Sequence, residues 1–292
     1  MKKSIYFAAL ALLCTGCAID NNISQVTDCQ IRVEAWLPTR VSGTRFEVGD
    51  RMSLYAVEYE NESVAPLQIS GNYFNNELLT FNGTKWDGTR PLYWSDKACD
   101  FYALYPYQQP KSATANLFDI TPDQNSTPTD SSLSGYEASD LLWAKAENIS
   151  YANGVVPLHF KHLMSRVVVN IERGPKYEGE LPDDIVVHLY NTVTTAEVDY
   201  ANGSLQSYSL GEKNTITMKR LSKETFAAIV VPQNIERRTP LIEVTMEGIA
   251  YLLNYSISFR PGYQHTITVT LNTSPDQEKI EINIDGEVGG WQ

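Results

Sequence analysis

The sequence predicts an all-β protein built from β-sandwiches, on the evidence of three features. Apolar and polar residues alternate over many short stretches, which gives each stretch one apolar face as a strand. Turn-forming pairs of residues separate these stretches. No long segment with a helical period and helix caps interrupts the pattern. Many short strands with frequent turns are typical of sandwich folds.

The alternation recurs from one end of the chain to the other. Apolar residues occupy every second position in residues 31–35, 52–56, 158–162 and 242–246, so we expect each stretch to be a strand with one buried face. Two other runs are apolar almost throughout, residues 167–171 and residues 227–231, and both favour strands that are buried on both faces.

Turn signals separate these predicted strands, namely Asn82-Gly83, Asn153-Gly154, Asn202-Gly203 and Pro261-Gly262. Residues 138–146 are compatible with either one helical turn or a loop. Residues 108–136 are rich in Ser, Thr, Pro, Asn and Asp, and we interpret them as a long surface excursion within a first domain.

The amino terminus has the features of a lipoprotein signal peptide. Two lysines precede an apolar run over residues 5–13, and the small residues Thr15 and Gly16 stand directly before Cys17. The apolar run is well short of the roughly 20 residues of a transmembrane helix. We therefore expect residues 1–16 to be removed and Cys17 to carry the acyl chains that anchor the protein.

Chain length and a change in pattern suggest two domains after this signal peptide. A mature chain of about 276 residues fits two domains better than one. We place the boundary near Ser165, so that the β-branched run at 167–171 opens the second domain and the polar stretch over residues 173–184 lies early in it. The expected division is residues 17–165 and residues 166–292.

The cysteines do not indicate a metal or redox centre. Cys14 and Cys17 form a C-x-x-C pattern, but Cys14 leaves with the signal peptide and Cys17 is lipidated. Only Cys29 and Cys99 remain in the mature chain. They are candidates for one disulfide in an oxidising compartment, and the sequence leaves the paired and unpaired states open.

The charge of the chain argues against nucleic acid as a partner. The net charge is -12, and it becomes about -14 once Lys2 and Lys3 are removed. No Lys or Arg run is longer than a pair such as Arg237-Arg238. A phosphate-binding protein needs a clustered basic surface, which this sequence lacks.

No familiar catalytic or cofactor motif occurs in the mature chain, so we expect neither an enzyme nor a cofactor. His159 and His162 are the most plausible metal ligands, but residues three apart on a strand point to opposite faces. We expect a buried His162, an exposed His159 and no metal site. The acidic pairs Asp183-Asp184 and Asp96 with Asp100 would serve a hydrolase only if they converged in a cleft, and solvated loops are the alternative.

Three tryptophans lie near turn-like segments: Trp86, Trp94 and Trp143. Exposed aromatic rings can stack on the faces of sugars, so these residues support an alternative function in glycan binding. Core packing is the other explanation, because large aromatic side chains are highly buried on average.

Several motifs, in order along the chain, give a resemblance to a known family. They are TRVSGTRFEVGDRMSLYA, LYW followed by DFYALYP, SDLLWAKA with VVPLHFKHLMSRVVVNI, AAIVVPQ, and FRPGYQHTITVTLN. Together they extend from about Thr39 to Asn272. In this respect the chain resembles the fimbrillin family of Bacteroidetes lipoproteins, which are subunits of pili.

This resemblance implies a fold, a cellular location and a mode of assembly. It implies two tandem transthyretin-like β-sandwich domains and an outer-membrane lipoprotein exposed at the cell surface. It also implies maturation by a surface protease, polymerisation with other fimbrillin subunits by strand exchange, and adhesion to a host or bacterial ligand. The family includes tip and anchor subunits, so the role within the fimbria stays open.

Specific residues match the family's scheme of strand exchange. Ile280, Ile282 and Ile284 have the alternation of a donor strand, although the last strand of the chain's own sheet would have the same rhythm. The displaced strand would be residues 29–36, released by cleavage after Arg40 or Arg45. A disulfide between Cys29 and Cys99 would block that release.

Overall fold

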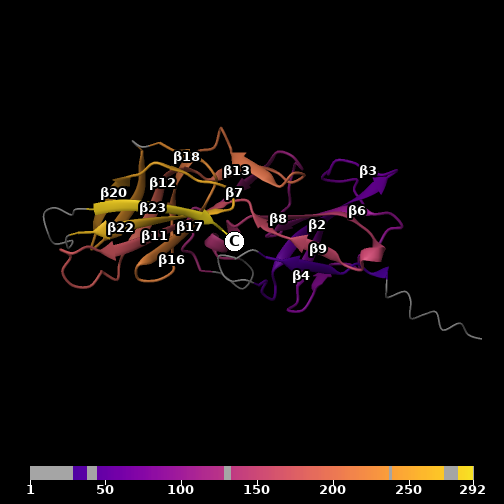
Figure 1. Cartoon of the computed structure of the whole chain (residues 1–292), viewed down its shortest axis with the longest axis horizontal. Coiled ribbons are helices and arrows are strands. Elements are labelled where there is room, and N and C mark those ends of the chain that lie inside the picture. Colours follow the sequence, from indigo (N-terminus) through magenta and orange to yellow (C-terminus); the bar gives the residue numbers. More distant parts are fainter. Residues whose placement is uncertain (1–28, 38–44, 128–132, 237–238, 273–281, 292) are drawn as a thin grey trace, which may run out of the picture.

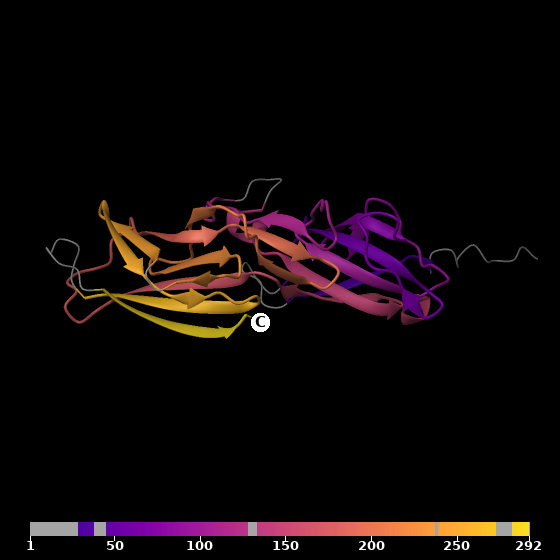
Figure 2. The ribbon, with the colours of Figure 1, turned by 90° about the horizontal axis from the view of Figure 1, so that it is seen from above.

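The computed structural model describes residues 29–37, 45–127, 133–236, 239–272 and 282–291, with only the backbone of residues 282–285. The predicted all-β class is confirmed, because strands account for almost all of the regular structure (Figure 1). The chain forms two lobes that lie end to end along one axis (Figure 2). Cys17, Arg40 and Ile280 lie outside the described residues.

The N-terminal lobe contains one large sheet and one small one. The large sheet has the order β10-β8-β6-β2-β4-β5, with β3 paired to β2. The small sheet pairs β1 (Val33–Trp36) with β9 (Val156–His159) in parallel. The strands of the large sheet are β2 (Arg51–Glu60), β3 (Ser63–Val64), β4 (Phe74–Phe81), β5 (Trp86–Gly88), β6 (Cys99–Tyr105), β8 (Leu142–Ile149) and β10 (Lys161–His162).

The C-terminal lobe contains two larger sheets. One has the order β16 (Lys219–Arg220), β17 (Thr225–Val230), β11 (Ser165–Arg173), β22 (Tyr263–Leu271) and β23 (Ile282–Gly290). The other has the order β15 (Lys213–Thr217), β12 (Val186–Val193), β19 (Pro240–Met246) and β20 (Ile249–Asn254). Two small sheets complete the lobe: β14 (Ser204–Ser207), β13 (Thr195–Asp199) and β7 (Asn116–Asp119), and β18 (Asn234–Ile235) with β21 (Ile257–Ser258).

The two runs predicted to be buried on both faces are central strands. In β11, Val167, Val168 and Val169 are all buried, so both faces of the strand lie in the interior. β11 pairs with β22 on one edge and β17 on the other. β17 is likewise buried along most of its length. Burial on both faces explains why these strands carry continuous apolar sequences.

The strand β2 differs from its prediction of one buried face. Met52 and Leu54 contribute to the core of the N-terminal lobe, as the alternation predicts. Tyr55 and Val57, on the other face, are also buried, and they belong to the hydrophobic cluster that continues into the C-terminal lobe. The large sheet is therefore covered on both faces, because one face meets the second lobe.

The predicted surface excursion over residues 108–136 is wrong for much of its length. β7, from this segment, pairs with β13 of the C-terminal lobe. Phe118 and Ile120 are buried in the same hydrophobic cluster as that lobe. The buried amide of Gln124 donates to the carbonyl oxygen of Ile229 at 2.7 Å and accepts from its N–H at 2.7 Å. The polar composition of the segment hid this non-local pairing.

The ambiguous residues 138–146 form mainly a strand. The helix α1 (Gly135–Ala138) ends where this stretch begins, and β8 occupies the rest from Leu142. A capping box between Ser134 and Glu137 starts the helix, because each residue binds the backbone N–H of the other.

Candidate functional site

The strand β1 is paired along one edge only. It forms a parallel ladder with β9, from Val33 opposite Val156 to Trp36 opposite His159. Among the described residues, its other edge has no strand partner. That edge borders a groove of about 470 Å³, whose walls include Phe46, Phe81 and Trp86. An unpaired strand edge beside an apolar groove is a suitable place for another strand to add.

Phe46 fixes the chain next to this groove. Its ring centroid lies 4.7 Å from that of Trp86, 5.5 Å from that of Tyr105 and 5.8 Å from that of Phe160. Arg45, one of the two predicted cleavage residues, is exposed directly before Phe46 and also lines the groove. The chain that follows Arg45 is therefore held against the core of the N-terminal lobe by Phe46.

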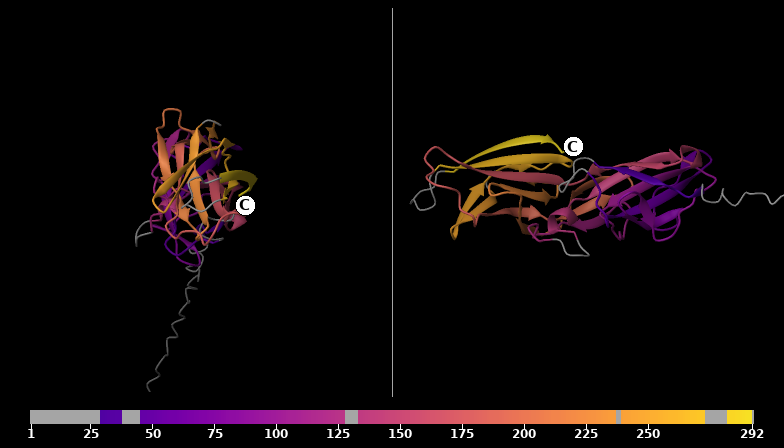
Figure 3. Two further views of the ribbon diagram at one scale, coloured as in Figure 1. Left: turned by 90° about the vertical axis from the view of Figure 1, so that its left-hand side faces the viewer. Right: turned by 90° about the horizontal axis from the view of Figure 1, so that it is seen from below.

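The strand β23 contains two of the three predicted donor residues. Ile282 lies opposite Leu271, and Ile284 lies opposite Val269, in an antiparallel ladder with β22. β23 is the last strand of its sheet, and its outer edge has no partner within the described part of the chain. β23 runs along the margin of the C-terminal lobe toward the junction between the lobes (Figure 3).

The two histidines lie as predicted. The exposed imidazole of His159 stacks on the ring of Trp36, with centroids 4.6 Å apart. His162 is buried, and its Nδ1 lies 2.8 Å from a carboxylate oxygen of Asp140. Within the described ranges, no group of three His, Cys, Asp or Glu side chains could hold a metal ion.

The three tryptophans are all partly buried. The Nε1 of Trp143 donates to the carbonyl oxygen of Tyr200 at 2.7 Å, and the ammonium of Lys161 lies 4.6 Å from the ring centroid. Trp143 therefore joins the two lobes. Trp86 packs on Phe46 beside the groove.

Trp94 differs from the other two tryptophans in its surroundings. Its ring packs edge-on against Phe101 with centroids 6.0 Å apart. It also lines a cleft of about 400 Å³ with Asp96 and the exposed Tyr151. Trp94 therefore shares a cleft with a second aromatic ring and a carboxylate.

Cys29 and Cys99 are free thiols. Cys29 is exposed and Cys99 is buried, and burial raises the pKa of the Cys99 thiol to about 12. A thiol with such a pKa is almost entirely protonated at neutral pH and is a poor nucleophile. Among the described residues, no disulfide joins Cys29, before β1, to Cys99 of the large sheet.

The acidic pairs named above have separate surroundings. Asp100 is buried, 3.1 Å from the ammonium of Lys145, whereas Asp96 is exposed. Asp183 forms an ion pair with Lys223 at 2.9 Å, and Asp184 accepts a hydrogen bond from the backbone of Glu247. Asp100, Asp183 and Asp184 therefore each have a structural partner, and neither pair shares one.

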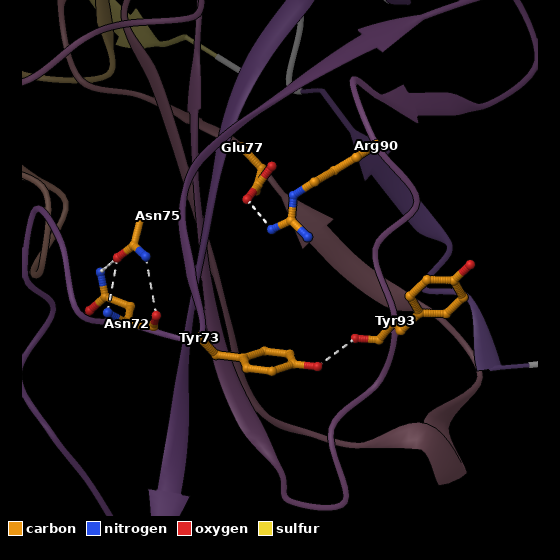
Figure 4. Close-up of polar contacts among 6 residues, drawn as sticks. All are labelled: Asn72, Tyr73, Asn75, Glu77, Arg90 and Tyr93. Atoms are coloured by element: carbon orange, nitrogen blue, oxygen red, sulfur yellow. Dashed lines mark hydrogen bonds and ion pairs between the residues drawn. The ribbon is translucent and has the colours of Figure 1, made fainter.

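Exposed polar side chains near β4 are held by one another (Figure 4). The side-chain oxygen of Asn75 accepts hydrogen bonds from the backbone and side chain of Asn72, both at 2.9 Å. The Tyr73 hydroxyl donates to the carbonyl oxygen of Tyr93 at 3.0 Å. The guanidinium of Arg90 pairs with Glu77 at 2.5 Å. These contacts order the loops at this end of the lobe.

Within the parts of the chain that the structure describes, no helix has both the length and the apolar character to cross a bilayer.

Solved structures of proteins from Bacteroides species have the same fold. A protein assigned to cell adhesion from Bacteroides ovatus is 16% identical, with a TM-score of 0.68 over 90% of this chain and 98% of that one. A second one, from Bacteroides uniformis, is 19% identical, with a TM-score of 0.66 over 91% and 99%. A fimbrial protein from Bacteroides ovatus is 19% identical, with a TM-score of 0.52 over 85% and 51%.

No curated protein matches the chain at a significant level. A family model described as fimbrillin-like matches residues 39–291, which is most of the chain and includes both lobes. The chain belongs to the fimbrillin-like family.

Proposed function

We propose that the chain is a structural subunit of a cell-surface fimbria that assembles by strand exchange and takes part in adhesion, and that it is not an enzyme. One observation carries this proposal: the first and the last described strands, β1 and β23, are each paired along a single edge. A strand paired on one edge leaves its sheet with fewer lost hydrogen bonds than a central strand does.

Departure of β1 opens a place for a new strand. The ladder with β9 breaks, and the buried side chains of Val156 and Leu158 lose part of their cover. Ile31 also gives up its backbone hydrogen bond to the carbonyl oxygen of Leu92, at 2.8 Å. The uncovered surface is continuous with the groove beside Phe46 and Trp86. An extended segment with alternating apolar residues satisfies both the backbone and the groove.

The carboxyl-terminal segment has the required rhythm. Ile280, Ile282 and Ile284 stand at alternate positions, as do Ile31, Val33 and Ala35 of the departing segment. Isoleucine is larger than valine or alanine, so the incoming strand buries more apolar surface than the one it replaces. That difference favours exchange over return of the original strand.

The steps before exchange concern residues outside the described ranges, with Arg45 as the exception. Cys17 carries the lipid anchor that holds the exported precursor at the outer membrane, after removal of the signal peptide. A surface protease then cuts after Arg40 or Arg45 and frees the segment that contains β1. A subunit that escapes cleavage serves as an anchor, and one without a usable donor strand serves at the tip.

We further propose that the two lobes are tandem transthyretin-like β-sandwiches, residues 17–165 and 166–292. The large sheets β10-β5 and β16-β23 support this division. The pairing of β7 with β13 adds a short segment of the first unit to the second.

A cleavage experiment tests the fimbrial function. The mature chain is treated with a trypsin-like protease, and its mass is followed by light scattering while mass spectrometry locates the cut. We expect oligomers to appear only after cleavage at Arg40 or Arg45, and the double variant R40Q/R45Q to remain monomeric. A chain that is cut there and loses β1 but stays monomeric contradicts a role in the shaft.

A second candidate function is glycan binding by the surface lipoprotein. The cleft that contains Trp94, Tyr151 and Asp96 favours it, because an aromatic ring beside a carboxylate suits a sugar. Binding on a glycan array that is lost in Trp94→Ala and retained in Trp143→Phe supports this function. Absence of any glycan signal from the wild-type chain excludes it for the glycans tested.

A further inference from the structure

The residue after β23, Trp291, is buried although the five residues directly before it are exposed. Trp291 is 6% exposed, whereas Gly286, Glu287, Val288, Gly289 and Gly290 are all exposed. Three of these five residues are glycines, which have no side chain to pack and weaken a strand. Among residues 286–291, Trp291 is therefore the side chain that holds the end of the strand.

The ring of Trp291 occupies a site at the junction of the lobes. It stacks on the imidazole of His162, with centroids 3.5 Å apart and planes 11° apart. His162 is held in turn by Asp140, and both residues are buried. The backbone N–H of Trp291 donates to the carbonyl oxygen of Gly262 at 3.0 Å. We name His162, Asp140 and Gly262 the Trp291 socket.

The socket draws on both lobes. His162 belongs to β10 of the N-terminal sheet, whereas Gly262 stands directly before β22 of the C-terminal sheet. The strand β23 ends beside this junction (Figure 1, and the right panel of Figure 3). Trp291 therefore ties the last strand to the place where the two lobes meet.

One polar atom of Trp291 is left unsatisfied. Among the described residues, the indole N–H has no hydrogen-bond partner although it is buried. Buried tryptophans usually find a partner for this group, and its absence costs about 1–3 kcal/mol relative to water. A groove of about 320 Å³ that includes Arg166 and Glu287 adjoins the ring. The ring of Trp291 therefore stacks closely on His162, but its indole N–H lacks a hydrogen bond. This missing hydrogen bond lowers the free energy needed to move the ring out of the site.

We propose that the Trp291 socket is the binding site that retains this chain's own carboxyl-terminal strand, and that exit of Trp291 is the step that frees β23. The socket and the edge of β22 together recognise an extended segment that is followed directly by a tryptophan. The consequence for assembly rests on the proposed function, because a retained strand cannot act as a donor. The retention itself is a property of the single chain.

Hydrogen exchange on the intact mature chain tests this proposal. Exchange of the β22 and β23 amides is measured by mass spectrometry for the wild type, Trp291→Ala, Trp291→Phe and the matched control Val288→Ala. Val288 lies on the same strand and is 55% exposed, so its truncation removes apolar surface without emptying the socket. We expect Trp291→Ala to speed exchange in β23 at least about tenfold, since burial of a large side chain is lost.

The other variants define the limits of the result. Trp291→Phe keeps a stacked ring and should give an intermediate rate, and Val288→Ala should match the wild type. Exchange in Trp291→Ala within twofold of the wild type overturns the proposal. Equal acceleration in β11 and β23 also overturns it, because that result means general destabilisation.

Assembly after cleavage is scored separately from exchange. Faster oligomer growth in Trp291→Ala links the socket to the proposed function. Faster hydrogen exchange without oligomers supports the proposal that Trp291 retains β23, but it counts against the proposed fimbrial role.

Discussion

The ring of Trp36 lies almost parallel to that of His159, with centroids 4.6 Å apart and planes 12° apart. Both side chains are exposed, so the stack lies on the outside of the small sheet. Ile31, which precedes β1, and Val33 of β1 instead pack against the core of the N-terminal lobe. Two kinds of contact therefore retain β1: apolar packing on its inner face and the aromatic stack on its outer face.

Loss of the stack between Trp36 and His159 should speed release of β1. In Trp36→Ala the stack is gone, which removes about 1 kcal/mol and corresponds to roughly a fivefold faster release of the cleaved segment. Mass spectrometry of the separated fragment after cleavage at Arg45 gives the rate. Glu34→Gln changes an exposed neighbour on the same strand and should release at the wild-type rate. Equal rates in all three chains would show that the stack does not hold β1.

A charged side chain at one of the alternating apolar positions of the donor segment should stop assembly. Ile284→Asp places a carboxylate where an apolar side chain must enter the groove beside Phe46, and desolvation of that charge opposes insertion. We expect no oligomers after cleavage, by light scattering. The control Asp285→Asn alters the adjacent position on the other face of the strand and should assemble normally. Normal assembly of Ile284→Asp would exclude this segment as the donor.

Gly203 tests the packing of Trp143 between the lobes. Gly203 has a φ of 60°, and a Cβ there would overlap the Trp143 ring, so Gly203→Ala must displace the ring. We expect a loss of about 2 kcal/mol or more in the free energy of unfolding.

Gly154→Ala is the matched control for this prediction. Gly154 also has a positive φ, of 72°, but a Cβ there meets nothing within 4 Å, so only backbone strain of about 1 kcal/mol is expected. Urea unfolding compares the two variants. Equal losses would mean that the Trp143 contact contributes little to stability.

His265 should make the chain less stable in mild acid. Burial, and then the positive charge of Arg260, lower the pKa of His265 below its ordinary value, and its Nε2 accepts the backbone N–H of Arg260 at 3.1 Å. The unfolded chain therefore takes up a proton first. The stability that neutral His265 contributes is present above about pH 6.5 and is lost as pH falls toward the folded-state pKa.

The variant His265→Gln isolates this effect, because glutamine can accept the same hydrogen bond without titrating. Its free energy of unfolding should fall less than that of the wild type between pH 7.5 and 5.5. His159→Gln, at an exposed position, should keep the wild-type slope. An unchanged slope in His265→Gln would mean that another group controls the acid response.

The sequence predicts the strands well and their partners poorly. Alternation and turn pairs identify local structure, so the two faces of β19 and the buried His162 follow from the sequence. Burial of the second face of β2 does not follow, because it depends on where the other lobe lies. The pairing of β7 with β13 also does not follow, because the two strands are far apart in the sequence and the polar segment that contains β7 resembles a loop.

The sequence likewise identifies only some residues of the candidate site. Arg45, Ile282 and Ile284 stand out because a residue type or a rhythm marks them. Phe46 and Trp291 do not, since a single aromatic residue has no period, and its packing partners come from distant strands. The one signal for Trp291 is a lone large aromatic residue after two glycines at the end of the chain.

Cross-linking between labelled copies tests the central claim most directly. Chains with ¹⁴N and ¹⁵N are mixed, cleaved and treated with an amine-reactive cross-linker. Lys85 lines the groove beside β1, and Lys279 directly precedes the first isoleucine of the donor segment. Strand exchange predicts mixed-isotope links between Lys85 and Lys279 that appear only after cleavage. Oligomers that form after cleavage without such links would contradict it.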